Sequence, residues 1–423
     1  MTLIKNFDQL AKTPQRKIVL ELIEEALNSI QPEKILAQNL KLSDGVLRAV
    51  DKDFNLGEFE KVYLVGFGKG SARISKLVEN LLGEKLTGGF VIDGTQESFS
   101  KIKETIGTHP LPSQANLNFT QNVLQNLSGL SENDLVIIVV CGGGSAMLVS
   151  PQDGITLEDK IRVDKELLKS GATIEEMNII KKHMSKVKGG GLAKALHPAK
   201  VVGLVFSDVP GNDMSVIASG PITKDSSTIE DAKNIINKYG IDSDIAAKLV
   251  EPPKEDKYFE NVSTFLMLSN QTALTAMANK AKTLGANARI HSDKLQADAR
   301  AVGQQLVTET QKGEILLVGG ETTLKVNGNG IGGRNLEVVL NSLRFLDENA
   351  IIASFDSDGW DNCSAAGAIG DMQTIAAAKT QNLNVEQYLK DNNSLEFFEK
   401  TGDAILTGRL PSNVSDLIVV YKY

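Results

Sequence analysis

Several kinds of residue are scarce in this chain of 423 residues, and each scarcity argues against a class of protein. The two cysteines, Cys141 and Cys363, stand far apart and form neither a disulfide framework nor a zinc pattern, which fits a reducing cytoplasm. Aromatic residues make up only 5%, too few for stacking platforms that hold single-stranded nucleic acid. Four histidines in the whole chain argue against a histidine-based metal site.

Positive charge and long apolar runs are also lacking. The net charge of -8 repels nucleic acid and anionic membranes unless a local patch overrides it. No window approaches 18 uncharged apolar residues, and the first residues lack the apolar core of a signal peptide. We therefore expect a cytoplasmic protein with a small-molecule substrate and neither nucleic acid nor membrane as partner, and a homodimer stays open.

What the chain has is an alternation of buried strands and amphipathic helices. Apolar runs at 62–67 and 134–140 read as strands covered on both faces, and helical spacing of apolar residues follows at 72–82. Strands separated by helices predict an α/β fold with a mainly parallel, Rossmann-like sheet and flanking helices over residues 1–250.

A proline- and charge-rich break at 249–263 is interpreted as a linker, after which the alternation restarts. The run at 263–268 is predicted as the first strand of a second domain, residues 251–423. Residues 314–326 are predicted as a hairpin or two short strands, so this second sheet is expected to be mixed. The helical pattern at 178–196 is expected to present Lys182, Ser185 and Lys188 on one face, either solvated or binding an anion.

Glycine clusters follow nearly every predicted strand. Ligands of parallel α/β sheets bind beyond the carboxyl ends of the strands, where glycine lets backbone N–H groups approach an anion. Clusters in both halves predict a phosphate-rich ligand between the domains. They lie at 66–70, 142–144, 189–191, 211, 319–320, 328–333 and 359.

Lys69 lies in the first of these clusters and has three interpretations. It could hold a phosphate, lie beside a dinucleotide, or sit at a solvated bend. The segment does not have the P-loop spacing, and Ser71 stands where the dinucleotide fingerprint has its third glycine. Gly66, Gly68 and Asp93, at the end of the next predicted strand, still fit part of that fingerprint. A dehydrogenase therefore remains an alternative.

Carboxylates after two predicted strands are candidate Mg²⁺ ligands. Asp208 ends the strand near 201–207 with Asp213 following, and Asp358 lies in a similar turn after the strand near 350–356. The alternative is that these side chains only cap turns of the backbone. Glu321 lies in a polar turn. Arg334 begins a helix after two glycines, where its guanidinium could grip a carboxylate or a phosphoryl group bidentately.

Taken in order, these motifs resemble the glycerate 2-kinase family, whose C-terminal half is the MOFRL domain. The matching segments run from about residue 60 to 420, and "TGRLPSNVSD" near the end departs from the family's usual threonine-glycine run. They are "GFGKGS", "THPLP", "CGGGSAML", "KKHMSKVKGGGLA", "SDVPGNDMSVIASGP", "GGETT", "GGRNLE" and "SDGWDNCSAAGA".

The resemblance implies a two-domain kinase that uses ATP and Mg²⁺ to phosphorylate D-glycerate at its 2-hydroxyl, with the active site between the domains. It implies catalytic or substrate-binding roles for Lys69 and Arg334. Two further hypotheses stay open: an NAD(P)-dependent hydroxypyruvate or 2-hydroxy acid reductase, and a sensor that binds a sugar phosphate without turnover. The remaining site predictions are ATP contacts at Gly142, Gly143, Gly144, Lys188, Gly189 and Gly190, substrate contacts at Gly68, Ser71, Ser145, Glu321 and Asn335, and Mg²⁺ ligands at Asp208, Asp213 and Asp358.

Overall fold

The computed structural model describes residues 2–241 and 243–423, and these form two compact units. Residues 35–207 and 212–267 make the first, which we call the parallel-sheet unit. Residues up to 34, 208–211 and 268–423 make the second, the mixed-sheet unit. The N-terminal helices thus group with the C-terminal half, whereas the sequence suggests a single division after residue 250.

The parallel-sheet unit contains a six-stranded sheet in the order β6-β5-β4-β7-β8-β9. Neighbouring strands from β4 to β8 pair in parallel, as the alternation predicts. The run at 263–268 lies in β9 of this sheet, so its prediction as the first strand of the second domain is wrong. The strands are β4 Lys61–Phe67, β5 Gly88–Asp93, β6 Ile102–Ile106, β7 Asp134–Val140, β8 Lys200–Phe206 and β9 Val262–Leu268.

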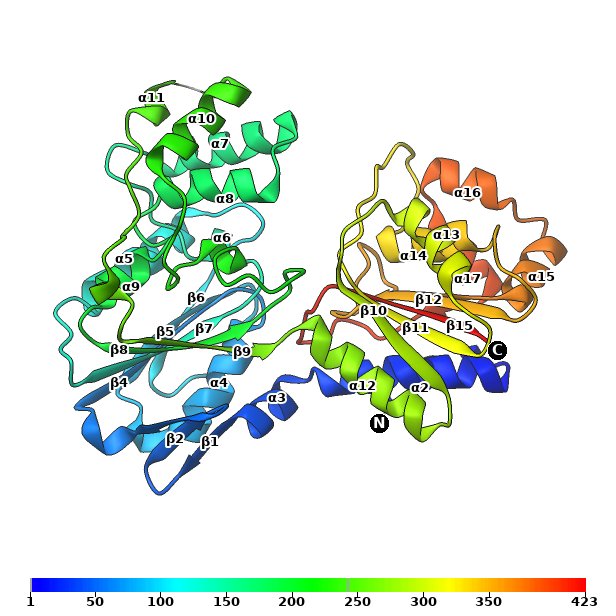
Figure 1. The fold of residues 1–423 in the computed structure, drawn as a ribbon, viewed down its shortest axis with the longest axis horizontal. Helices are drawn as coiled ribbons and strands as arrows, with labels where there is room; N and C mark the ends of the chain where they lie inside the picture. Colours follow the sequence, from blue (N-terminus) through cyan, green and yellow to red (C-terminus); the bar gives the residue numbers. More distant parts are fainter. Residues whose placement is uncertain (1, 242) are drawn as a thin grey trace. The chain divides into compact units, whose positions relative to one another are not determined.

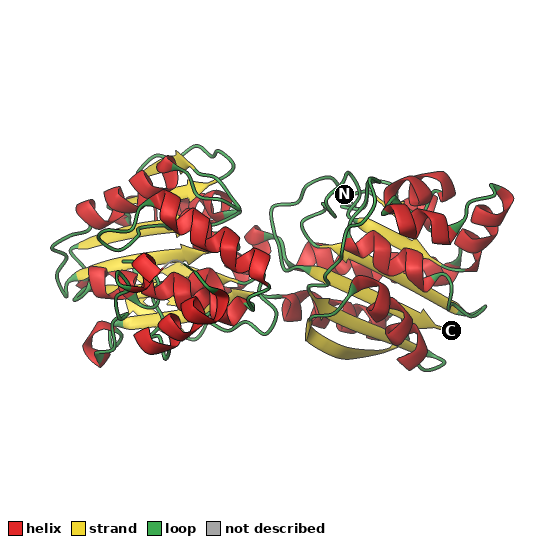
Figure 2. Cartoon of the chain, turned by 90° about the horizontal axis from the view of Figure 1, so that it is seen from above, coloured by secondary structure: helices red, strands yellow, loops and turns green. Residues whose placement is uncertain are grey.

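Helices cover both faces of this sheet (Figures 1 and 2). A small antiparallel sheet of β1 Leu40–Ser43, β2 Val46–Ala49 and β3 Lys52–Asn55, absent from the sequence predictions, adds to the unit. Helices α7, α8, α10 and α11 share their own apolar cluster. The helices from α3 onward are α3 Pro32–Asn39, α4 Ser71–Leu82, α5 Gln114–Asn126, α6 Gly144–Met147, α7 Leu157–Ser170, α8 Ile174–His183, α9 Gly191–Leu196, α10 Ile229–Tyr239 and α11 Ser243–Ala246, with 3₁₀ turns η1 Leu56–Glu58, η2 Gly83–Lys85, η3 Ile217–Ser219 and η4 Asp256–Tyr258.

The helix predicted through 178–196 is broken, because α8 ends at His183 and α9 begins only at Gly191. Lys182, Ser185 and Lys188 therefore do not form one solvated helical face, and all three are buried. The ammonium of Lys182 pairs with the buried carboxylate of Asp225 at 2.8 Å.

The mixed-sheet unit contains a six-stranded sheet in the order β10-β11-β15-β12-β13-β14, with β10 and β11 parallel and the other pairs antiparallel. The predicted mixed sheet is confirmed, but the hairpin at 314–326 is wrong, because only its first half forms a strand. The strands are β10 Asn287–Leu295, β11 Glu314–Gly320, β12 Ala350–Asp356, β13 Gly367–Gly370, β14 Ala404–Ile405 and β15 Asp416–Lys422.

The core of this unit lies between the sheet and α13, α14 and α17, while α2 and α12 lie side by side against the sheet (Figure 1). The register pairs Asp416, the first residue of β15, with both Gly320 and Asp356. The pairing brings polar residues of three strands to one sheet edge. The helices are α1 Phe7–Leu10, α2 Pro14–Ser29, α12 Asn270–Thr283, α13 Ala299–Glu309, α14 Arg334–Ser342, α15 Met372–Thr380, α16 Val385–Asp391 and α17 Ser394–Thr401.

Candidate active site

The loop between β4 and α4 packs tightly against the loop after β7. Gly68 has a φ of +108°, and a Cβ built there would lie 2.4 Å from the carbonyl oxygen of Cys141. The Lys69 N–H donates to the carbonyl of Gly142 at 2.8 Å. Gly68 is therefore required for close approach of two backbones. The Lys69 side chain is exposed, and its ammonium has no ion pair within the described ranges 2–241 and 243–423.

The start of α4 is already occupied by a carboxylate of the protein. Asp93 accepts hydrogen bonds from the N–H groups of Ala72 at 2.9 Å and Gly94 at 2.6 Å. Burial raises the pKa of Asp93 despite these donors. The Ser71 hydroxyl is buried and donates to the carbonyl of Ile92 at 3.0 Å. Asp93 thus caps a helix, which removes the ribose-binding role that the dinucleotide alternative gave it.

The loop from Cys141 to Ser145 offers unused backbone donors. The Gly144 N–H donates to the carbonyl of Cys141 at 3.1 Å. The N–H groups of Gly142 and Gly143, by contrast, have no acceptor among the residues that the structure describes. Together with the Lys69 ammonium on the adjoining loop, they form a group of donors suited to an anion.

His109 lies beside the same donors. In the sequence it was part of the matching segment "THPLP", but no role was predicted for it. A Cβ built on Gly143 would lie 2.8 Å from the imidazole, so the ring of this exposed residue rests on the loop. Desolvation, followed by the charge of Lys69, lowers the pKa of His109 to about 4. The imidazole is therefore neutral near pH 7, and Lys69 supplies the positive charge of this group.

Lys188 lies behind this loop rather than in front of it. Its ammonium is buried and donates to the Ser145 carbonyl at 2.7 Å, the Ser145 hydroxyl at 3.2 Å and the Leu148 carbonyl at 3.3 Å. Burial lowers the pKa of Lys188 well below its usual value. The Ser145 hydroxyl also lies 2.9 Å from that of Ser219, which donates to the Asn178 side chain at 2.8 Å. This network fixes Ser145 from the protein side.

The two glycines that follow Lys188 have no spare donors. The Gly189 N–H donates to the carbonyl of Ser219 at 3.0 Å, and the Gly190 N–H to that of Gly220 at 2.8 Å. Both glycines have positive φ, +55° and +88°, and serve the turn into α9. Of the predicted ATP contacts, Gly142 and Gly143 keep free N–H groups, whereas Lys188, Gly189 and Gly190 brace the loop.

In the mixed-sheet unit, Arg334 is surrounded by carboxylates. Its Nε lies 2.8 Å from an oxygen of Asp416, its Nη2 lies 3.3 Å from Asp356, and its Nη1 lies 3.1 Å from Glu321. Partial burial acts to lower the pKa of Arg334, but these charges, led by Asp416, raise it above its usual value. Burial, with the charges of Asp358 and Asp416, raises the pKa of Asp356. The guanidinium is therefore the positive centre of an acidic group.

The start of α14 is fixed by Asp361. Its carboxylate accepts the N–H groups of Asn335 at 3.2 Å and Leu336 at 2.8 Å, and burial raises its pKa to about 7. The Asn335 side chain is fully buried; its amide donates to Asp416 at 2.7 Å and accepts from Ser354 at 2.6 Å. Asn335 thus positions the group around Arg334. The sequence motif offered Asp361, like Asp358, as a carboxylate suited to Mg²⁺, and it gave no sign of Asp416.

The three predicted Mg²⁺ ligands have different surroundings. Asp213, in the parallel-sheet unit, accepts the Ser215 N–H at 2.8 Å. In the mixed-sheet unit, the carbonyl of Asp208 accepts the Ser415 hydroxyl at 2.6 Å, and Asp358 accepts the Trp360 N–H at 2.9 Å. Within residues 2–241 and 243–423, no three His, Cys, Asp or Glu side chains form a group that could hold a metal ion.

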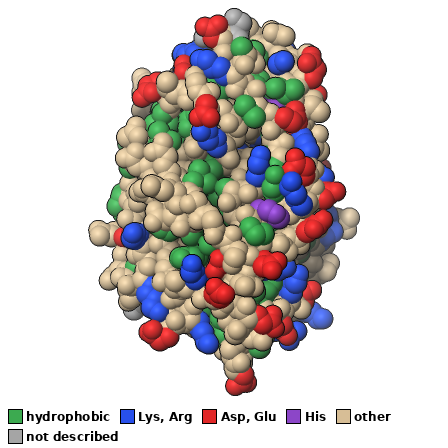
Figure 3. Space-filling model, turned by 90° about the vertical axis from the view of Figure 1, so that its left-hand side faces the viewer, with side chains coloured by type: hydrophobic (Ala, Val, Ile, Leu, Met, Phe, Trp, Pro, Cys, Tyr) green, Lys and Arg blue, Asp and Glu red, His purple; other side chains and the backbone are tan. Residues whose placement is uncertain are grey.

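Two broader properties accompany this geometry. On the face of the parallel-sheet unit shown in Figure 3, lysine and arginine side chains are interspersed with acidic ones rather than gathered in one patch. In the described part of the chain, no helix is both long and apolar enough to span a membrane.

Comparison with known proteins places the whole chain in one family. A family model described as a domain of unknown function, DUF4147, matches residues 18–251, and the MOFRL family model matches residues 314–416. The D-glycerate 2-kinase of Thermotoga maritima is 35% identical over 420 residues, covering 96% of this chain and 97% of that protein. A putative hydroxypyruvate reductase of Agrobacterium vitis is 35% identical over 376 residues, covering 84% of this chain and 85% of that protein.

Among solved structures, a glycerate kinase from Thermotoga maritima superposes with a TM-score of 0.85 at 35% identity, covering 96% of this chain and 99% of the other. The fold is therefore shared along almost the full length. From these matches and the site geometry, we conclude that the chain belongs to the glycerate 2-kinase family and is an enzyme of the kinase class.

Proposed function

We propose that this protein transfers the γ-phosphoryl group of ATP to the 2-hydroxyl of D-glycerate, giving 2-phospho-D-glycerate and ADP, with Mg²⁺. Relatives named for this activity match nearly the full chain. The observation that carries the proposal is the exposed side chain of Lys69 on a loop that adjoins the unused N–H groups of Gly142 and Gly143. Phosphoryl transfer asks a protein mainly for such positioned donors and positive charge.

In this proposal Gly142 and Gly143 donate to phosphate oxygens of the nucleotide. Lys69, a mobile point charge on the adjoining loop, follows the phosphoryl group as it moves. His109, neutral near pH 7, adds no charge and packs the loop that carries the donors. Lys188 acts indirectly by fixing the position of Ser145.

Arg334 has a different role from the clamp for the substrate carboxylate that its sequence context suggests. Its guanidinium already contacts Asp416, Asp356 and Glu321. We propose that it holds this acidic group in place and offsets part of its charge. Lysine could not span three carboxylates with one ammonium.

Mg²⁺ bound to a nucleotide needs only one or two protein carboxylates, because phosphates and water complete its shell. Asp213 and Asp358 each accept a backbone N–H at one oxygen, and a carboxylate in that state keeps lone pairs for a cation. We keep Asp208, Asp213 and Asp358 as proposed ligands. Held by these carboxylates, the ion would supply positive charge that offsets the charge of the phosphates.

The reductase alternative has support from two relatives named putative hydroxypyruvate reductase, but its ribose-binding carboxylate, Asp93, caps α4 instead. Two parallel incubations test the proposal: the first with D-glycerate, ATP and Mg²⁺, the second with hydroxypyruvate and NADPH. We expect ADP in the first and no NADPH oxidation in the second. NADPH oxidation would support a reductase, and the absence of turnover in both would support a binding protein.

A further inference from the structure

A stacked pair of exposed side chains lies in the mixed-sheet unit next to Asp358, one of the proposed Mg²⁺ ligands. The guanidinium carbon of Arg409 lies 4.2 Å from the ring centroid of Trp360, the shortest cation–π distance within the described residues. The indole is 37% exposed, and Arg409 is exposed as well. A large aromatic face and a cation at the surface are therefore presented together, which is an unusual use of the only tryptophan in the chain.

The two loops that carry this pair are interlocked. Asp358 accepts the Trp360 N–H at 2.9 Å through its side chain and the Leu410 N–H at 2.7 Å through its carbonyl. A Cβ built on Gly359 would lie only 2.0 Å from the carbonyl of Gly408. Because the backbones fit this closely, the two loops hold the main chains of Arg409 and Trp360 side by side. This arrangement favours the stack.

The charge of this pair is not compensated by the protein. No carboxylate lies within ion-pair distance of Arg409 in the ranges 2–241 and 243–423. The ammonium of Lys5, also without an ion pair in those ranges, lies beside the same loop, 2.5 Å from a Cβ built on Gly408. These two cations, one on the loop and one beside it, contrast with Arg334, which contacts three carboxylates, and with the net charge of -8.

A guanidinium held over an indole keeps the N–H groups along its edge free. Two of these donors match the two oxygens of a carboxylate or phosphate, and stacking on the indole orients the plane of the guanidinium. Pre-organisation of this kind reduces the entropy lost when an oxyanion binds. The chemistry of the site is therefore recognition of an oxyanion.

We propose that Arg409, stacked on Trp360 with Lys5 beside it, binds the carboxylate of the acid substrate. The inference rests on the proposed function and deepens it, because it names the residue that recognises the acid group. The guanidinium of Arg334, already in contact with carboxylates, is not free for that task. A phosphate of the nucleotide has the same chemistry, so the experiment separates the two sources.

Because Trp360 is the only tryptophan, its fluorescence reports directly on this site without turnover. The protein is titrated separately with D-glycerate, ATP and inorganic phosphate. We expect a saturable change with D-glycerate and none with ATP at the same occupancy of the nucleotide site. A response to ATP or phosphate but not to D-glycerate would overturn the assignment to the substrate carboxylate.

The matched variants are Arg409→Met, Arg409→Lys and Arg344→Met, the last removing an exposed arginine that contacts Phe345. We expect Arg409→Met to raise the KM for D-glycerate at least tenfold, with kcat changed less than threefold and the melting temperature retained. Arg409→Lys should recover part of the loss, and Arg344→Met should match the wild type. An unchanged KM for D-glycerate in Arg409→Met would contradict the inference.

The two proposals fail in different ways. Absence of ADP formation with D-glycerate would contradict the proposed function. A D-glycerate-dependent fluorescence change that disappears in Arg409→Met would still support the binding site, because it needs no turnover. Conversely, normal phosphorylation by Arg409→Met with an unchanged KM would contradict the binding site alone.

Discussion

Lys69 and Lys188 lie in loops of the same unit but in opposite surroundings. Lys69 is exposed beside unused N–H groups, whereas Lys188 is buried and donates to three oxygens. An exposed lysine such as Lys69 can follow a charge that moves during the reaction, whereas a buried lysine such as Lys188 fixes the position of a loop. The sequence predicted a catalytic role for Lys69 and an ATP contact for Lys188. It could not show that Lys188 is buried, because burial depends on the backbone path around a residue.

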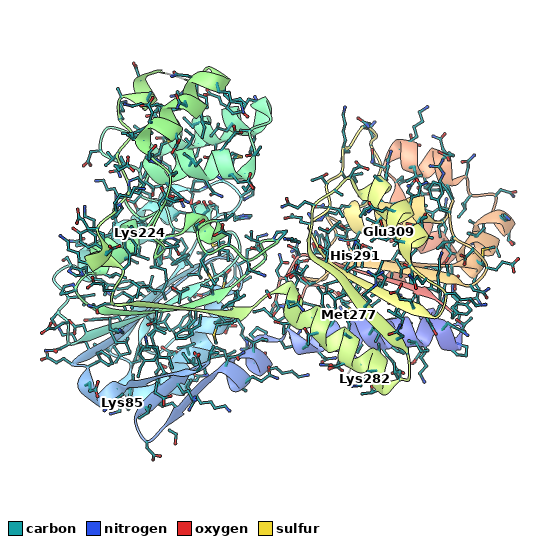
Figure 4. The ribbon with its side chains drawn as sticks, viewed as in Figure 1. Lys85, Lys224, Met277, Lys282, His291 and Glu309 are labelled. Atoms are coloured by element: carbon teal, nitrogen blue, oxygen red, sulfur yellow. The ribbon has the colours of Figure 1, made fainter. Side chains whose placement is uncertain are left out.

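Replacing Lys69 by Met should lower kcat roughly a hundredfold, the scale for losing one pre-organised electrostatic donor. Nucleotide affinity should change far less, because Gly142 and Gly143 remain. The matched control is Lys85→Met, an exposed lysine in η2 after α4 (Figure 4). Steady-state kinetics and a nucleotide titration on both variants check this. Equal kcat values in the two variants would contradict a catalytic role for Lys69 and favour its interpretation as a solvated lysine at a bend.

Arg334→Lys should lose nearly as much kcat/KM as Arg334→Ala, because one ammonium cannot replace contacts to Asp416, Asp356 and Glu321. Both variants should also lose stability, by about 3 kcal/mol for the alanine, since largely buried carboxylates are left unpaired. Kinetics and urea denaturation are measured together. Near wild-type stability and activity in the lysine variant would contradict the role as the centre of the acidic group.

Asp361→Asn should change how stability depends on pH. The pKa of Asp361 is about 7 in the folded protein, against about 4 in the unfolded chain. The folded state therefore binds more protons between these values, and the stabilising contribution of Asp361 is complete below pH 4 and lost as pH rises through 7. Stability of the wild type minus that of Asp361→Asn should fall across this window in urea denaturation at a series of pH values. A difference that rises with pH would contradict the assignment.

At the scale of single residues, the sequence identified positions better than roles. Glycine context pointed to Lys69, Gly142 and Gly143, which the structure brings together. It could not separate Ser71, whose hydroxyl is buried against Ile92, from a residue that meets a ligand. Asp416 was missed because its place beside Arg334 depends on strand register, which no local motif records.

At the scale of elements, periodicity predicted most helices and buried strands well. Local signals also mark the helix ends: Thr156 forms a capping box at the start of α7, and Gly240 closes α10. The errors arose where long-range pairing decides. The strand at 262–268 follows a linker-like segment yet joins the parallel sheet. The basic run after α8 does not continue that helix, and its Lys188 is buried and bonded to the Ser145 carbonyl.

Helix α2 is attached to the mixed-sheet unit by a buried ion group. Arg16 donates to both oxygens of Asp371, at 2.6 and 2.7 Å, and to Asp403 at 2.7 Å. Arg16→Met should cost about 3–5 kcal/mol of unfolding free energy, because buried Asp371 loses its counterion and buried Asp403 keeps only the half-buried ammonium of Lys12. Arg48→Met, which removes an exposed arginine 3.8 Å from Asp53, should stay within about 0.5 kcal/mol. Urea denaturation compares them, and equal losses would contradict the anchoring role.

At the scale of the whole molecule, each unit supplies a different kind of electrostatic group. The parallel-sheet unit carries unused N–H groups and the free charge of Lys69, which suit phosphate. The mixed-sheet unit carries the acidic group around Arg334 and the free cations Arg409 and Lys5. The order of motifs along the sequence already indicated the reaction class. It did not distinguish Arg334 from Arg409 as the residue free to bind an acid.

The central claim is that the chain phosphorylates D-glycerate at the 2-hydroxyl with ATP. The most direct measurement is phosphorus NMR of the reaction mixture after incubation with D-glycerate, ATP and Mg²⁺. The account predicts 2-phospho-D-glycerate and an equal amount of ADP, with both signals lost when D-glycerate is omitted. Formation of 3-phospho-D-glycerate, or no phosphorylated product while NADPH is oxidised in the parallel hydroxypyruvate reaction, would contradict it.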